Sequence, residues 1–168
     1  MARLRRSPRV HASEQESIYR IATDGGVTAL QRAPGQQLGR LYAAALECES
    51  FTVVRQHRLA VDGEPTDCKL LLLGDEEARL RGSALNTRVS SVLEATFYGH
   101  ALVVCVHAPG EDGDDETLAD VGVAYSAMGR GLTPPWSEQD IAAYRSEPLE
   151  GRVLELLELT TLDEESCW

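Results

Sequence analysis

Five residues between positions 79 and 88 have side chains suited to binding an anion. Arg79, Arg81 and Arg88 carry guanidinium groups, while Ser83 and Asn86 can donate hydrogen bonds. They surround the expected start of a helix, where the first backbone N–H groups lack partners and the helix dipole is positive. Because phosphates and carboxylates bind at such helix ends, the sequence predicts a ligand-binding site for a small anion here.

An ordinary helix start explains the same residues without a ligand. Ser83 is then the N-cap, and Asn86 braces the turn. The three arginines balance the acidic residues 75–77 that precede them, as ion pairs on protein surfaces commonly do. The sequence leaves both interpretations open.

Cysteine and histidine offer two further chemistries. Cys105 and His107 are two positions apart in an expected strand, so they share a face and could form a nucleophile–base pair. Both lie in an apolar run, which favours a core cysteine and a hydrogen-bonded histidine. A zinc site needs about four converging ligands, and His57, Cys68 and His100 add the residue types without a recognised spacing. We therefore expect no metal and no cofactor.

Enzyme signatures are absent from the sequence. There is no G-x-S-x-G nucleophile turn, no phosphate-binding loop and no dinucleotide fingerprint. The acidic segment 111–120 contains Asp112-x-Asp114, which resembles the start of a calcium loop, but the later glycine and the terminal glutamate are missing. We interpret this segment as an exposed acidic loop and expect no catalytic residues.

The candidate anion site depends on a helix at about 84–98. Leu85, Val89, Val92 and Leu93 recur at helical spacing, and Gly99 is a typical stop. The apolar runs at 68–73 and 100–107 flank this segment. Their near-continuous apolar character predicts strands covered on both faces.

Other segments predict the remaining elements. A D-G-G turn indicates a hairpin between runs 18–22 and 27–31, and an apolar stripe indicates a helix at about 35–47. Strands are expected at 50–55 and 58–61, and a short helix near 137–145. The segment 152–160 fits either a helix or a strand, and we favour a strand because Gly151 precedes it and two threonines follow.

These elements predict one α+β domain with a mixed or mainly antiparallel sheet. The chain has 168 residues, of which 43% are hydrophobic, enough for a single core. We expect a loose basic arm at 1–17 and an α+β core at 18–108. Residues 109–168 should form the acidic loop and a C-terminal extension that packs on the same core.

The charge balance limits the class of partner. A formal net charge of −11 repels nucleic acid and anionic membranes but permits a basic protein partner. The N-terminus lacks the apolar core of a secretory signal, and the apolar run 101–106 is too short to span a bilayer. With four cysteines and no C-x-x-C, we expect a cytoplasmic protein without disulfides.

The order of features from about 18 to 107 resembles a family of small domains. The matching stretches are IYRIATDGGVTALQ, LGRLYAAALE, SFTVV, GDEEARLRG, LNTRVSSVL and GHALVV. The family is catalogued as domain of unknown function 3846 and is carried by phages, plasmids and actinobacterial chromosomes. It typically has an Asn at the helix start, which would be Asn86 here, although Leu85 and Val89 replace its usual proline and alanine. The resemblance implies a mobile-element accessory protein without an established activity.

The function hypothesis is a small non-enzymatic binding or regulatory protein that engages a small anionic ligand or a protein partner. The first alternative is an acidic decoy that uses residues 111–116 and the C-terminal DEES to occupy a basic site of a nucleic-acid enzyme. The second alternative is an enzyme of unrecognised type.

Overall fold

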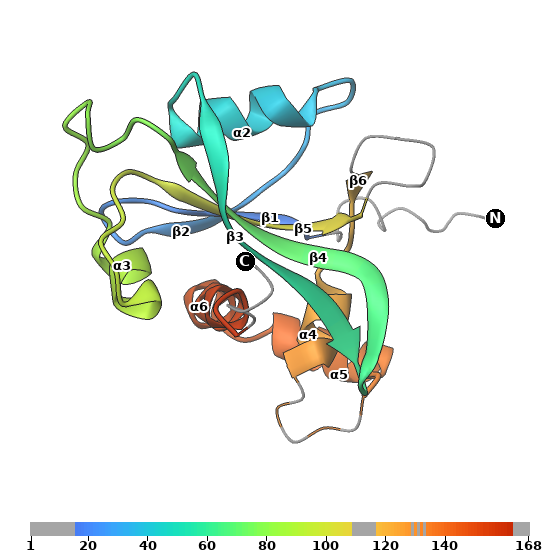
Figure 1. The fold of residues 1–168 in the computed structure, drawn as a ribbon. Helices are drawn as coiled ribbons and strands as arrows, with labels where there is room; N and C mark the ends of the chain where they lie inside the picture. Colours follow the sequence, from blue (N-terminus) through green and yellow to red (C-terminus); the bar gives the residue numbers. More distant parts are fainter. Residues whose placement is uncertain (1–15, 109–116, 129, 131, 133, 163–168) are drawn as a thin grey trace.

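A six-stranded antiparallel sheet forms the centre of the protein (Figure 1). The structure is a computed structural model, and it describes residues 16–108, 117–128, 130, 132 and 134–162. Within these residues the chain is a single α+β domain, as predicted, and the sheet is antiparallel throughout. The described residues form five helices, whereas the sequence predicted three. Most of the expected basic arm and residues 109–116 of the expected acidic loop lie outside the described residues.

The strands follow the order β2-β1-β5-β4-β3, and β6 pairs with β5. In chain order the elements are β1 (Ile18–Ile21), β2 (Val27–Leu30), α2 (Leu38–Leu46), β3 (Phe51–Val61), β4 (Glu64–Asp75), α3 (Thr87–Leu93), β5 (Ala101–His107), β6 (Thr117–Leu118), α4 (Gly122–Met128), α5 (Glu138–Arg145) and α6 (Leu149–Leu159).

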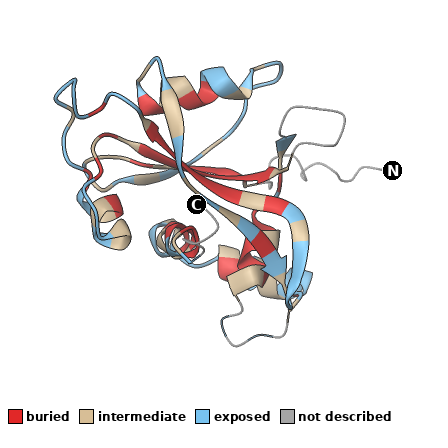
Figure 2. Cartoon of the chain, viewed as in Figure 1, coloured by how far each residue is buried: buried red, intermediate tan, exposed pale blue. Residues whose placement is uncertain are grey.

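The central strands are buried on both faces, as their apolar runs predict (Figure 2). Side chains alternate along a strand, so Leu70 and Leu72 of β4 face one side of the sheet while Leu71 and Leu73 face the other. The predicted helix at 35–47 is confirmed as α2, which packs Leu41 on the second side. The first side is covered by α3, α4, α5 and α6 (Figure 1).

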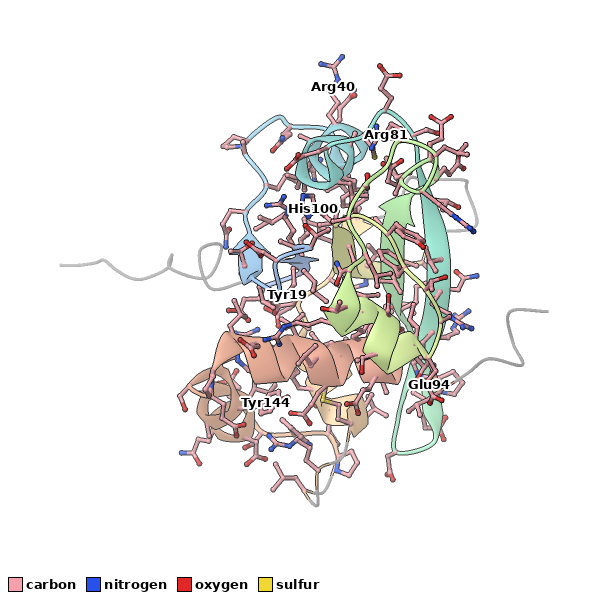
Figure 3. All side chains as sticks on the ribbon, turned by 90° about the vertical axis from the view of Figure 1, so that its left-hand side faces the viewer. Tyr19, Arg40, Arg81, Glu94, His100 and Tyr144 are labelled. Carbon is pink, nitrogen blue, oxygen red and sulfur yellow. The ribbon has the colours of Figure 1, made fainter. Side chains whose placement is uncertain are left out.

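A buried hydrogen-bond network joins the sheet to these C-terminal helices. The Tyr19 hydroxyl donates to Glu16 at 2.8 Å and lies 3.4 Å from the Tyr125 hydroxyl. Arg152, which is 6% exposed, donates to both Glu16 and Tyr125 at 3.0 Å. Because a buried guanidinium needs such partners, the network fixes α4 and α6 against β1. Figure 3 shows Tyr19 on the side of α6 that faces the sheet and Tyr144 on the other.

The strand predicted at 152–160 is wrong, because this segment belongs to helix α6. Val153, Leu156 and Leu157 recur at helical spacing and are fully buried against the sheet. Gly151 does not prevent the helix, since it lies near the helix start where a Cβ atom would meet open space. The short helix predicted near 137–145 is confirmed as α5, with Ser137 and Asp140 forming a capping box.

None of the helices among the described residues is long and apolar enough to cross a membrane.

Candidate functional site

The helix expected to hold the anion begins later than predicted, at Thr87. Asn86, not Ser83, is the N-cap, because its Oδ1 accepts a hydrogen bond from the Val89 N–H at 3.2 Å. Its Nδ2 donates to the carbonyls of Ile21 and Gly99 at 3.0 Å each. Asn86 is completely buried, so its polar atoms hold the fold together and do not face a ligand.

Helix α3 also ends earlier than position 98. Glu94 adopts a left-handed conformation with φ 56°, and the chain then folds back on itself. The Asn86 N–H donates to the Phe97 carbonyl at 2.8 Å, and the Phe97 N–H donates to the Ser90 hydroxyl at 2.9 Å. These bonds replace the helical ones, so the predicted helix at 84–98 is shortened to seven residues.

The three arginines of the candidate anion site point to different partners. Arg79 lies over the Tyr98 ring, with its guanidinium carbon 5.9 Å from the ring centroid. Arg88 forms a 2.6 Å ion pair with Glu150 of α6. Arg81 pairs with Asp75, whose side chain is only 3% exposed. The structure therefore does not gather Arg79, Arg81, Ser83, Asn86 and Arg88 around one ligand position. Of the three arginines, only Arg81 pairs with a residue of the acidic run 75–77, as the alternative expected.

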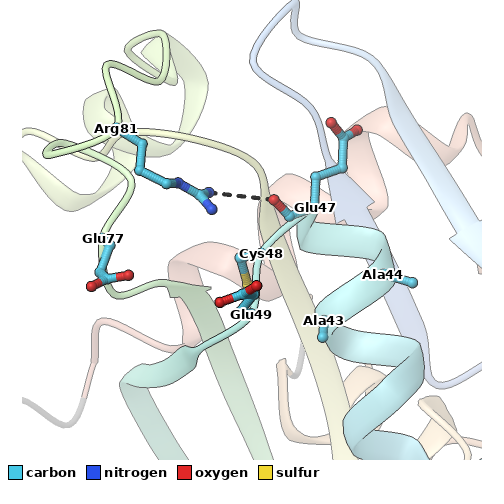
Figure 4. Close-up of a pocket in the computed structure, with 7 residues that line it drawn as sticks. All are labelled: Ala43, Ala44, Glu47, Cys48, Glu49, Glu77 and Arg81. Atoms are coloured by element: carbon cyan, nitrogen blue, oxygen red, sulfur yellow. Dashed lines mark hydrogen bonds between the residues drawn. The ribbon is translucent and has the colours of Figure 1, made fainter.

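Arg81 instead lines an open cleft of about 590 Å³ (Figure 4). One wall is the last turn of α2 with residues 47–49, and the other is the turn after β4, which carries Glu77 and Arg81. Figure 4 shows the Arg81 side chain reaching across to the Glu47 carbonyl oxygen, to which it donates at 3.3 Å.

The cleft is predominantly acidic. Glu47, Glu49 and Glu77 line it, whereas the charge of Arg81 is already matched by Asp75. The negative end of the α2 dipole lies in the same wall, and the last turn of α2 contains no basic residue. A bound anion would meet repulsion from these groups, whereas a positively charged group would be attracted.

The side chains of Glu49 and Glu77 are exposed and form no hydrogen bond or ion pair with any described residue. Glu47 differs, because it contacts Arg20 at 2.9 Å and His100 at 3.3 Å. Cys48 lies at the base of the cleft as a free, half-buried thiol. Burial and, to a lesser extent, Asp75 raise the pKa of this thiol, so it is protonated at neutral pH and a poor nucleophile.

The cleft was not predicted from the sequence. Its walls come from two turns about thirty residues apart, which the pairing of Phe51 with Asp75 in β3 and β4 brings together. The Glu76 N–H also donates to the Ser50 carbonyl at 3.2 Å, and Arg81 bonds to Glu47. The acidic run 75–77 was a possible signal, but a run of surface carboxylates by itself does not identify a binding site.

Cys105 and His107, the nucleophile–base pair considered from the sequence, have different partners in the structure. The Cys105 thiol donates a weak hydrogen bond to the Asp120 carbonyl at 3.9 Å, and burial raises its pKa. His107 lies opposite Cys68 across β4 and β5, with its Nδ1 3.5 Å from the Cys68 sulfur. His100 accepts from the Thr23 N–H at 3.2 Å on the α2 side.

Comparison of the chain with protein-family models, curated proteins and solved structures gave no match. The resemblance to domain of unknown function 3846 therefore stays a prediction, and the function must be argued from the geometry of this chain.

Proposed function

We propose that this chain is a small non-enzymatic binding or regulatory protein whose acidic cleft receives a basic segment of a partner protein. The observation that carries the proposal is the pair of exposed carboxylates, Glu49 and Glu77, on opposite walls of one cleft. Neither carboxylate has a partner in the part of the chain that the structure describes, and beside the negative end of a helix such a pair favours an arginine or lysine side chain. A small anion, the other ligand predicted from the sequence, is disfavoured there because only Arg81 opposes three glutamates.

The turn that forms the second wall also presents an apolar contact. Leu80 is 86% exposed and lies between Arg79 and Arg81. Protein interfaces combine a central apolar contact with surrounding charges, whereas a small ion would use only the charges. This feature supports a protein partner over a metabolite.

The proposal is tested with a short peptide of alternating Arg and Ser, and with an Asp and Ser peptide for comparison. We expect the basic peptide to bind and to shift the amide NMR signals of residues 47–49 and 76–81. The double variant Glu49→Gln/Glu77→Gln should bind it about fivefold more weakly, since each exposed ion pair contributes up to about 1 kcal/mol.

A basic peptide could also bind non-specifically to a protein of charge −11, so a control variant removes the same number of charges outside the cleft. Asp62→Asn/Glu64→Gln alters the turn between β3 and β4 by the same two charges and should leave the affinity nearly unchanged. Equal weakening by both double variants would contradict the cleft as the binding site. A rise in melting temperature with phosphate or nucleotides would favour the small-anion hypothesis instead.

The acidic decoy is a second candidate, favoured by the net charge of −11. Its proposed contacts, 111–116 and the C-terminal DEES, lie outside the described residues. It predicts that neutralising residues 111–116 abolishes inhibition of a nucleic-acid enzyme, whereas Glu49→Gln/Glu77→Gln has little effect. The resemblance adds the proposal of a cytoplasmic accessory protein of a mobile element, which the neighbouring genes would test.

A further inference from the structure

The side chains of Asp67, Cys68 and His107 converge at one end of the β4–β5 pair. Cys68 and His107 are directly opposite in the antiparallel register, so their side chains leave the same face of the sheet at the same level. The carboxylate of Asp67, the residue before Cys68 in β4, lies close to both. One donor atom from each of the three lies within 4.8 Å of the others.

The contacts between these side chains are similar in length to the ligand–ligand distances around a tetrahedral metal ion. The Cys68 sulfur is 3.5 Å from His107 Nδ1 and 3.6 Å from Asp67 Oδ1, and His107 Nδ1 is 3.4 Å from Asp67 Oδ2. With ordinary zinc bond lengths, tetrahedral geometry places sulfur and nitrogen donors about 3.5 Å apart and nitrogen and oxygen donors about 3.4 Å apart. The Cys68 and His107 donors thus already have the spacing of two zinc ligands, whereas the Asp67 carboxylate presents a different oxygen to each partner and must rotate for one oxygen to bind the metal.

A nucleophile relay does not fit the same geometry. In a Cys–His–Asp relay the two imidazole nitrogens face different partners, one the nucleophile and the other the carboxylate. Here His107 Nδ1 faces both Cys68 and Asp67. Burial and Asp67 raise the pKa of the Cys68 thiol to about 11, which also disfavours a nucleophilic thiolate at neutral pH.

Backbone contacts hold the three residues in place. The Ala108 N–H donates to the Asp67 carbonyl at 2.7 Å, which links the residue after His107 to the residue before Cys68. The Cys68 N–H donates to the Thr66 hydroxyl at 3.1 Å, and that hydroxyl donates to the Leu59 carbonyl at 2.8 Å. The site is therefore preorganised by the strand pairing of β3, β4 and β5.

The three donor residues differ in their exposure to solvent. Cys68 is 5% exposed, whereas the side chains of His107 and Asp67 are 43% and 73% exposed. A metal ion can thus reach the three donors from solvent and keep a fourth position for water. Zinc sites that carry an exchangeable water have three protein ligands of this kind.

We infer that Asp67, Cys68 and His107 form a binding site for a zinc-type divalent metal ion, with water as the fourth ligand. Thiolate and imidazole donors favour zinc or cobalt over calcium or magnesium, which prefer oxygen. Binding replaces the thiol proton with the metal and releases one proton. The site lies at the far end of the sheet from the acidic cleft, so it is independent of the proposed function.

The test uses the full chain, stripped with a chelator and titrated with cobalt(II) chloride and then with zinc chloride. We expect one equivalent of cobalt to produce thiolate-to-cobalt charge-transfer absorption, and zinc to abolish that absorption by displacement. Cys68→Ser should eliminate the charge-transfer band, and His107→Gln should weaken binding at least about tenfold, the loss expected when a metal site is disrupted.

Matched controls are Cys48→Ser and His57→Gln, which remove the same residue types elsewhere and should preserve binding. Circular dichroism establishes that each variant is folded, and the partly exposed His107→Gln gives a second readout if Cys68→Ser unfolds. A band that persists in Cys68→Ser, or an unchanged cobalt affinity in folded His107→Gln, overturns the inference. So does binding of less than one equivalent by the unmodified chain.

Discussion

The carboxamide of Asn86 bonds to three backbone groups from three parts of the chain. Its oxygen caps α3, and its nitrogen donates to the carbonyls of Ile21 and Gly99. Asn86→Ala removes the cap and leaves two buried carbonyls without these donors. We expect it to lower the free energy of unfolding by about 3 kcal/mol, measured by urea denaturation.

Two further substitutions test whether α3 is capped by Asn86 or by Ser83, the N-cap predicted from the sequence. Asn86→Asp keeps the shape and the capping oxygen but supplies no N–H donor, so it should destabilise the protein at least as much as Asn86→Ala. Ser83→Ala should change the stability by less than about 0.5 kcal/mol, as surface substitutions usually do. A larger loss for Ser83→Ala than for Asn86→Ala would show that α3 begins at Ser83.

The sequence predicted the N-cap of this helix at Ser83, whereas the structure has it three residues later, at Asn86. Both types are common N-caps. The choice is made by the carbonyls of Ile21 and Gly99, one of which is 65 residues away in the chain. The arginines show the same limit in part. Asp75, the partner of Arg81, belongs to the acidic run that the sequence offered, whereas Tyr98 and Glu150 lie beside Arg79 and Arg88 only in the folded chain.

Among the elements, the strands with apolar runs and the Gly-containing hairpin turn were predicted well, whereas the two strands predicted at 50–55 and 58–61 are one strand, β3. The hairpin at Asp24–Gly26, the strand buried on both faces at 68–73 and the capping box of α5 each depend on neighbouring residues. Helix α6 was missed because its leucines and valine fit both periods over so short a segment. The segment forms a helix because its apolar side chains cover a face of the sheet, whereas a strand would have to pair at the edge of the sheet.

Gly151 allows a test of helix α6. A Cβ atom at this position would meet nothing within 4 Å, and its φ is compatible with any residue. We expect Gly151→Ala to raise the free energy of unfolding by about 0.5 kcal/mol, because alanine loses less backbone entropy in a helix. Thermal denaturation measures the change.

Gly99→Ala, between α3 and β5, is the opposing control for Gly151→Ala. Gly99 has φ +84°, and a Cβ atom there would lie 3.1 Å from the Ala78 Cβ. The substitution should therefore destabilise the protein by about 1 kcal/mol or more. Stabilisation by Gly99→Ala, or destabilisation by Gly151→Ala, would contradict the backbone described for these two segments.

Over the whole molecule, the acidic cleft and the Asp67–Cys68–His107 cluster share one property. Each is assembled from segments that are distant in sequence and are brought together by the sheet. The cleft joins the end of α2 to the turn after β4, and the cluster joins β4 to β5. Sequence spacing could not reveal either, because cross-strand register, not local order, sets which side chains meet.

The tyrosines that connect β1 to the C-terminal helices make the whole fold sensitive to alkaline pH. Burial raises the pKa of Tyr19, Tyr125 and Tyr144 above the ordinary value of 10.0, and neighbouring Tyr125 and Glu16 raise that of Tyr19 further. The unfolded chain therefore loses these protons at lower pH than the folded protein. The resulting stabilisation is fully present below about pH 10 and is lost as the pH rises beyond it.

We expect the free energy of unfolding to fall steeply above about pH 10, with the tyrosinate absorbance of Tyr19, Tyr125 and Tyr144 appearing together with unfolding and not before it. Tyr19→Phe should reduce the steepness of this fall, because one fewer proton is released on unfolding, although it also removes hydrogen bonds to Glu16 and Tyr125. Urea denaturation at a series of pH values measures the slope. Ionisation of the buried tyrosines in the folded protein near pH 10, or an unchanged slope in Tyr19→Phe, would show that the network does not link β1 to α4 and α6 as described.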